Sequence, residues 1–205
     1  MRVVRLSELD PVPVMDGQLS WLPVRRALGV TGFGINAYRA ADSGGLVVEE
    51  HDEAGLGHEE LYLVVTGRAA FEIAGKRVDV PAGSIVFLPE PGDRRVAHAE
   101  EPGTTVLAVG GPPGAPYTPS AWEWYFLASE AYRRGDYDEA YAIASPGLAE
   151  QPDHPGLLYN LACYRALAGR HDDALELARR AFELDPAPRA WADGDADLDA
   201  IRSRF

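Results

Sequence analysis

The feature that most constrains the fold is a repeat with a period of 34 residues in the second half of the chain. Stepping by this period pairs Tyr125 with Tyr159, Leu127 with Leu161, Ala128 with Ala162, Gly135 with Gly169, Ala140 with Ala174, and Pro152 with Pro186. Each unit contains two Ala- and Leu-rich stretches of helical spacing around a glycine turn. A fixed period predicts stacked helical hairpins, because each unit buries its apolar face only against the next.

The period and the order of helix, turn, helix and proline resemble the tetratricopeptide repeat family over about residues 120–187. Pro146 interrupts the second helix of the first unit, which we expect to be kinked or short. Two units are fewer than the roughly three that a free-standing array needs. We therefore expect cover from the first half of the chain, a partner subunit or the tail, where Trp191, Leu198, Ile201 and Phe205 fall on a roughly helical stripe.

The first half of the chain has the pattern of an all-β structure. Short runs rich in Val, Leu, Ile, Phe and Tyr lie at 21–26, 33–40, 46–53, 60–67, 68–75, 76–82, 84–90, 94–100 and 104–111. Turn signals join them at the spacing of a sandwich or barrel. We expect an α+β chain with a β-barrel domain at 1–112, a Pro/Gly linker at 113–121, and two helical repeats with a capping helix at 122–205.

Composition excludes several classes of partner. The chain has 19 basic and 32 acidic residues, a net charge of -13, and a single lysine, Lys76. The sequence has no cluster of Lys and Arg residues that could bind a phosphate backbone or anionic lipids. We therefore expect neither nucleic acid nor an anionic membrane as a partner. Cys163 is the one cysteine, and no segment has the pattern of a signal peptide or a membrane span. A reducing cytoplasm is therefore the expected location.

The stretch "EEHDEAGLGHEELYLVVTG", residues 49–67, resembles the first motif of the cupin superfamily, whose barrel would cover about residues 20–112. That motif is His-x-His, then Glu, six residues and Gly. His51 stands at the first histidine, Glu53 at the second, and Glu60 and Gly67 match the remainder. The resemblance implies a double-stranded β-helix, or jelly roll, in which three histidines and one carboxylate hold a divalent metal.

The second cupin motif departs from the family pattern. Its final histidine is replaced by Arg95, or by Arg94 if the turn is one residue shorter. A guanidinium is always charged and cannot ligate a metal. His98 shares the strand parity of Arg94, so it faces the pocket only if Arg94 does.

Strand alternation places Glu49, His51 and Glu53 on one face, and His58 can share the inward face of Glu60. Three interpretations stay open. One is an incomplete site of His51, Glu53, His58 and Glu60, with His98 as an outside candidate, holding Fe, Mn, Ni or Zn. Another is a metal-free pocket in which Arg95 pairs with an anionic ligand or with Glu60. The third is a degenerate barrel whose charges are solvated or form a structural ion pair. Tyr62, Glu49 and Arg95 are the candidate ligand-binding residues.

The favoured function is a regulatory or scaffolding binding protein. Its barrel would hold a small anionic molecule or a metal, and its repeats would contact another protein. The alternative is a metal-dependent isomerase, epimerase or oxygenase, with Glu60 or His51 as the proton-transfer group and Arg95 holding a substrate carboxylate. We also expect a homodimer, because the edge strands of cupins often pair between subunits and two repeats need cover.

Overall fold

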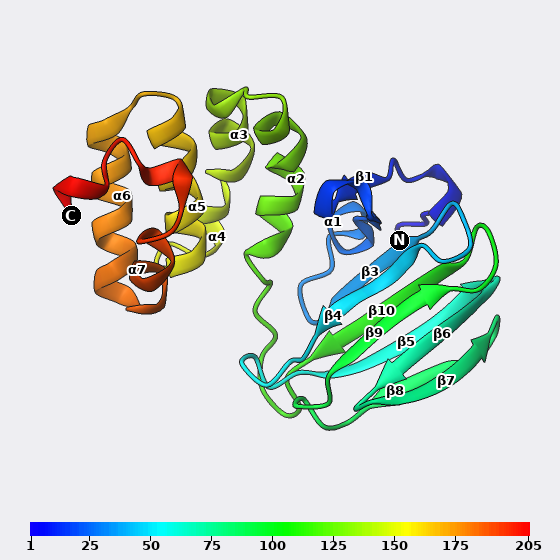
Figure 1. Cartoon of the computed structure of the whole chain (residues 1–205). Coiled ribbons are helices and arrows are strands. Elements are labelled where there is room, and N and C mark those ends of the chain that lie inside the picture. Colours follow the sequence, from blue (N-terminus) through cyan, green and yellow to red (C-terminus); the bar gives the residue numbers. More distant parts are fainter. The chain divides into compact units, whose positions relative to one another are not determined.

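The computed structural model describes all 205 residues, which form two compact units, Met1–Pro119 and Ser120–Phe205 (Figure 1). The first unit is built from antiparallel β-sheets and the second from helices. The α+β class expected from the sequence is therefore confirmed. None of the helices combines the length and the apolar character that are needed to cross a membrane.

The first unit contains a six-stranded and a four-stranded sheet, in which every neighbouring pair is antiparallel. The larger sheet has the order β1 (Val12–Val14), β2 (Leu19–Leu22), β3 (Gly34–Arg39), β10 (Thr105–Gly111), β5 (Glu59–Thr66) and β8 (Ile85–Leu88). The smaller has the order β4 (Leu46–His51), β9 (Arg95–Ala99), β6 (Arg68–Ile73) and β7 (Lys76–Pro81). The eight strands predicted between residues 33 and 111 are all present.

The main core of this unit draws side chains from both sheets. Its buried members are Ala40, Val47, Val48, Tyr62, Val64, Ala69, Phe71, Val80, Leu88, Ala97, Ala99 and Val106. Alternation in β9 shows how the pleat selects them: Arg95, Ala97 and Ala99 are buried, whereas His98 is exposed. Across the core, the rings of Tyr62 on β5 and Phe71 on β6 lie 5.5 Å apart. Side chains of the two sheets therefore meet across the core.

The prediction of a strand at 21–26 is wrong beyond Leu22, because a short helix, α1 (Val24–Leu28), follows. Val24 and Leu28 are one helical turn apart and pack in the same apolar cluster as Leu22. Gly29 ends the helix in the left-handed conformation, with φ of 68°. Further short 3-10 turns lie at Leu6–Glu8 and Met15–Gly17.

The second unit consists of helical hairpins. Its helices are α2 (Trp122–Arg133), α3 (Tyr137–Ala144), α4 (Gly147–Glu150), α5 (Pro155–Leu167), α6 (His171–Leu184) and α7 (Ala187–Ala192). The break expected at Pro146 is present, since α3 ends at Ala144 and Pro146 is the N-cap of α4. Proline ends the first helix because it lacks the N–H that an α-helix requires.

The tail after α7 forms two 3-10 turns, Ala196–Leu198 and Arg202–Arg204. Leu198 and Ile201 are fully buried in the cluster that also holds residues of α5 and α6. Trp191 is 56 % exposed, although its ring lies 5.7 Å from that of Tyr159. The expected apolar stripe thus covers the second hairpin through Leu198 and Ile201, but not as a single helix.

Gly67, the residue that follows β5, lies close to the backbone of Thr104, and a substitution can test this close approach. Gly67 has φ of 72°, and a Cβ there would lie 2.4 Å from Thr104 Oγ1 and 2.9 Å from its Cα. Gly75 has φ of 77°, but a Cβ there would meet nothing within 4 Å. Both glycines require a conformation that costs an L-residue about 1–2 kcal/mol. The variant Gly67→Ala should therefore lower the free energy of unfolding of the barrel more than Gly75→Ala, by about 1 kcal/mol or more. Urea unfolding measures both, and equal losses would contradict the close approach at Thr104.

Candidate functional site

The candidate site lies between the two sheets, where β4 ends and where β5 and β9 begin. His51 is the last residue of β4, and its Cα partner across the ladder is Arg95, the first residue of β9. Glu60 and Tyr62 lie near the start of β5, in the other sheet. Glu53 lies in the connection from β4 to β5, where its backbone N–H donates to Pro91 O at 2.8 Å. Segments distant in the sequence therefore meet at this point.

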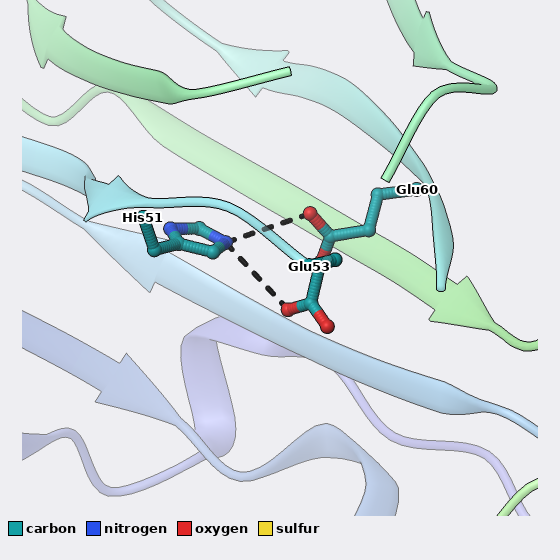
Figure 2. A group of neighbouring side chains, drawn as sticks. All are labelled: His51, Glu53 and Glu60. Atoms are coloured by element: carbon teal, nitrogen blue, oxygen red, sulfur yellow. Dashed lines mark ion pairs between the residues drawn. The ribbon is translucent and has the colours of Figure 1, made fainter. Parts of the chain in front are cut away.

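His51 is oriented by its own strand. Its Nδ1 lies 2.8 Å from the backbone oxygen of Glu49, and a carbonyl can only accept, so Nδ1 carries the proton. In the neutral ring, Nε2 is then a free acceptor. It faces two carboxylates, with Glu53 Oε1 at 3.8 Å and Glu60 Oε2 at 3.6 Å (Figure 2). Burial lowers the pKa of His51, but the interactions with Glu60 and with the Glu49 carbonyl outweigh it, and the net pKa is raised.

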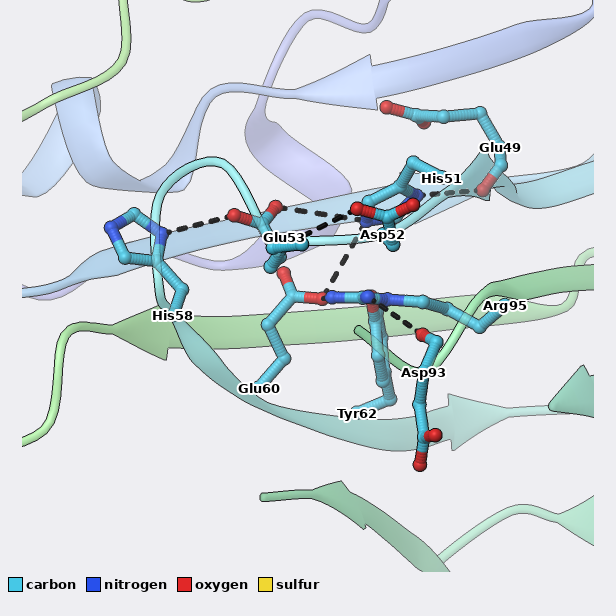
Figure 3. Close-up of polar contacts among 10 residues, drawn as sticks. Glu49, His51, Asp52, Glu53, His58, Glu60, Tyr62, Asp93 and Arg95 are labelled. Atoms are coloured by element: carbon cyan, nitrogen blue, oxygen red, sulfur yellow. Dashed lines mark hydrogen bonds and ion pairs between the residues drawn. The ribbon is translucent and has the colours of Figure 1, made fainter. Parts of the chain in front are cut away.

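Glu60 is held by a buried arginine and a buried tyrosine. Its Oε2 accepts hydrogen bonds from Arg95 Nε, at 3.1 Å, from the Arg95 Nη2 group and from the Tyr62 hydroxyl (Figure 3). Arg95 and Tyr62 are each 1 % exposed. Burial alone would raise the pKa of Glu60, but the nearby His51 ring and the hydrogen bonds from Tyr62 and Arg95 lower it to about 2. Glu60 is therefore a permanent anion at neutral pH.

Glu53 has the opposite electrostatic environment. Burial and the nearby Glu60 carboxylate raise the pKa of Glu53 to about 7, because no arginine neutralises it directly. Its Oε2 lies 3.3 Å from Nδ1 of His58, whose own pKa is lowered by burial. One carboxylate of the pair is thus fixed in charge, and the other exchanges a proton near neutral pH.

The structure decides which arginine faces the pocket. Arg95 points inward, and its Nη1 donates to Asp93 O at 2.9 Å. Arg94 points to solvent and pairs with Glu50 at 2.7 Å. His98 follows the outward parity and lies apart from the site, with Nδ1 3.3 Å from Gly44 O. His51, Glu53, His58, Glu60, Tyr62 and Arg95 are brought together, whereas Glu49 contacts His51 through its backbone carbonyl.

Three residues at the site offer candidate metal ligands. One atom from each of His51, Glu53 and Glu60 lies within 4.8 Å of the others. This spacing suits an ion whose bonds to N and O are ~2.0–2.2 Å long. The set nevertheless lacks the second and third histidines that the cupin resemblance implies. The Glu60 oxygen that faces His51 is also already the acceptor for Arg95 and Tyr62. The residues present therefore do not fit the metal site of that family.

A second cluster, in the helical unit, was missed at the sequence level. Tyr159 donates to Asp195 Oδ2 at 2.7 Å, and Tyr132 donates to Asp197 at 2.9 Å. Cys163 lies 3.7 Å from Asp195, and burial together with the two aspartates raises the pKa of its thiol. The Asp-x-Asp spacing was the available signal. The cluster fastens the tail to α2 and α5, and it keeps the buried thiol unreactive.

The raised pKa of Glu53 predicts a pH-dependent stability. A carboxyl whose folded pKa is about 7, above its ordinary value of 4.5, favours the folded state below pH 4.5 and loses this contribution as the pH rises through 7. Glutamine does not titrate. Glu53→Gln should therefore lose less stability between pH 5 and 8 than the wild type, by on the order of 1–2 kcal/mol. Urea unfolding at a series of pH values measures the difference, and identical slopes would contradict the assignment.

Comparison with known proteins covers the two units separately. Residues 131–193 match the family model described as tetratricopeptide repeat. No curated protein matches the chain. A structure of a predicted oxalate decarboxylase from Thermotoga maritima is 22 % identical, covers 53 % of this chain and 97 % of that chain, and has a TM-score of 0.43.

Two further structures are similar at the same level. A cupin protein from Bacteroides fragilis is 17 % identical, covers 58 % of this chain and 90 % of that chain, and has a TM-score of 0.43. A structure of a sugar phosphate isomerase from a cupin superfamily, from Silicibacter pomeroyi, is 18 % identical. It covers 53 % of this chain and 74 % of that chain, and has a TM-score of 0.44. Both resemblances that the sequence displays, to cupins and to tetratricopeptide repeats, recur in these comparisons.

Proposed function

We propose that this chain is a binding protein whose barrel takes up a small molecule beside His51 and Glu53, and whose helical unit contacts another protein. One observation carries the first part: the pocket keeps polar groups that its own ion pair does not use. The two carboxylate oxygens that face His51 Nε2 lie 3.6 and 3.8 Å from it, too far for hydrogen bonds. Polar atoms held in place without short partners are what a ligand needs for specific recognition.

The chemistry of the pocket favours a ligand that donates hydrogen bonds. The anionic ligand expected from the sequence would rely on Arg95, but that side chain is 1 % exposed and donates to Glu60 and Asp93 O. Glu53 and Glu60 would repel an anion. A small molecule with hydroxyl or amine groups meets two carboxylates and one imidazole instead.

Native mass spectrometry of the protein purified from cells tests this part. We expect the wild type to carry a bound small molecule. His51→Ala should lose it, because the variant removes a recognition group. His98→Ala should retain it, since His98 is an exposed histidine outside the site. Adding a mixture of sugars, polyols and amines, with the ring nitrogens of His51 followed by NMR, provides a second readout. No adduct and no shift of His51 with any component would contradict the proposal.

The proposed protein contact of the helical unit is supported by the family match over residues 131–193. Repeats of this kind present stacked helical faces rather than a catalytic pocket. We also propose a cytoplasmic location, because Cys163 is the one cysteine and is free and buried.

A homodimer is part of the proposal, and β8 is the strand that we assign to it. β8 is an edge strand, and its outward residues Ile85 and Phe87 are 60 % and 53 % exposed. Two copies of an edge strand can pair antiparallel about a two-fold axis, which sets the same apolar side chains against each other.

Light scattering at micromolar concentration should therefore give about twice the chain mass of 22.2 kDa. Ile85→Lys should shift the mass toward the monomer, because it places charges in the apolar contact. Val78→Lys is the matched control, since Val78 is 44 % exposed on β7, the edge of the other sheet. A monomeric wild type, or a dimer unaffected by Ile85→Lys, would contradict this assignment.

An enzyme is the second candidate function. It is favoured by the orientation of His51, whose Nε2 is aimed into the pocket as the acceptor that a general base requires. The isomerase or epimerase form fits this geometry, with His51 as the proton acceptor and Glu53 beside it. Exchange of substrate hydrogen with deuterium from solvent, present in the wild type and absent in His51→Ala, would support this candidate over binding alone.

A further inference from the structure

One oxygen atom, Glu60 Oε2, is the point at which a metal and the observed side chains would compete. It accepts from Arg95 Nε at 3.1 Å, from Arg95 Nη2, and from the Tyr62 hydroxyl. It is also the nearer of the two carboxylate oxygens that face His51 Nε2, at 3.6 Å against 3.8 Å for Glu53 Oε1. A carboxylate oxygen has two lone pairs, and here three donors already use them. An ion shared by His51 and Glu60 would need the same lone pairs.

Arg95 cannot give way easily. It is 1 % exposed, its Nη1 donates to Asp93 O at 2.9 Å, and its Nε lies 3.3 Å from the Tyr62 hydroxyl. Its backbone is fixed in β9 opposite His51. A guanidinium keeps its charge at every accessible pH. An ion bound within ~2.2 Å of Glu60 Oε2 would therefore face a positive charge held by three different contacts.

The geometry points to Arg95 as the resident cation of this barrel: its guanidinium occupies the electrostatic place of a divalent metal, and the pocket is built to function without one. Glu60 is neutralised by the side chain that stands at the position of the family's last histidine. The remaining open groups, His51 and Glu53, then face the ligand rather than a metal. This inference concerns the same pocket as the proposed function, but metal binding and ligand binding are measured separately.

Exchange of the arginine for the family residue tests the inference directly. Wild type, Arg95→His and Arg94→His are stripped with EDTA and titrated calorimetrically with Zn²⁺, Mn²⁺ and Ni²⁺. Arg94 is the matched control, because it is the adjacent arginine but is exposed and pairs with Glu50. Wild type and Arg94→His should show no site that binds one equivalent of metal per chain. Arg95→His should gain one, at least about tenfold tighter than any wild-type binding, because it removes the cation and adds an imidazole.

The double variant His51→Ala with Arg95→His separates this site from accidental surface binding, since it should lose the gained equivalent. Wild-type protein that binds one equivalent of metal, and loses it in His51→Ala, would overturn the inference. So would a folded Arg95→His variant that gains nothing.

If Arg95→His is unfolded without metal, recovery of its folded circular-dichroism spectrum on adding Zn²⁺ supports the inference. If it stays unfolded at every metal concentration, the wild-type titration decides alone: a site of one equivalent that depends on His51 overturns the inference, and no such site supports it. A failure of ligand binding in native mass spectrometry leaves each of these outcomes unchanged.

Discussion

The ion pair between Arg95 and Glu60 joins the two sheets of the barrel through their shared interior. Arg95 begins a strand of the four-stranded sheet, and Glu60 lies near the start of a strand of the six-stranded sheet. Removing one partner of such a buried pair typically costs ~3–5 kcal/mol, because the other charge is left uncompensated. Replacing both by apolar residues is often neutral, so the pair is better explained by the electrostatics it creates than by stability.

These electrostatics set the behaviour of the neighbouring groups. The arginine and the Tyr62 hydroxyl stabilise the Glu60 carboxylate. Burial is the main cause that raises the pKa of Glu53 to about 7, and the fixed negative charge of Glu60 is the second cause. His51 faces both carboxylates from a ring orientation set by its own strand. The barrel therefore contains a fixed anion, Glu60, with an internal counter-ion, next to a carboxyl whose pKa is about 7 and an imidazole whose pKa is raised.

The sequence predicted the two-part organisation, because period and alternation follow directly from helix and strand geometry. It also singled out the residues that the structure brings together around His51, together with His98, which lies apart from them. The 34-residue period indicated the hairpins, and the parity of β9 meant that His98 and Arg95 could not both face inward. Parity alone could not choose between Arg94 and Arg95. The choice depends on contacts from another strand, since Glu60 and Tyr62 provide the partners.

Other features depended on information that local patterns do not contain. Irregular pairing between β4 and β9 disturbs strict alternation before His51, so that Val47 and Val48 are both buried and Glu49 acts through its carbonyl. The helix at Val24–Leu28 was hidden because its few residues also suit a strand. The tail is held by the hydrogen bonds of Tyr159 to Asp195 and of Tyr132 to Asp197. The partners are separated by 36 and by 65 positions in the chain, respectively.

The ionisation of Glu60 in the metal-free protein is the most direct test of the claim that Arg95 acts as its counter-ion. An NMR titration that follows the side-chain carboxyl carbon of Glu60 measures its pKa without relying on activity or on a known ligand. The account predicts a carboxyl that stays ionised down to a pKa of about 2. A carboxyl that titrates at or above its ordinary value of 4.5 would show that the arginine does not neutralise it, and would contradict the account.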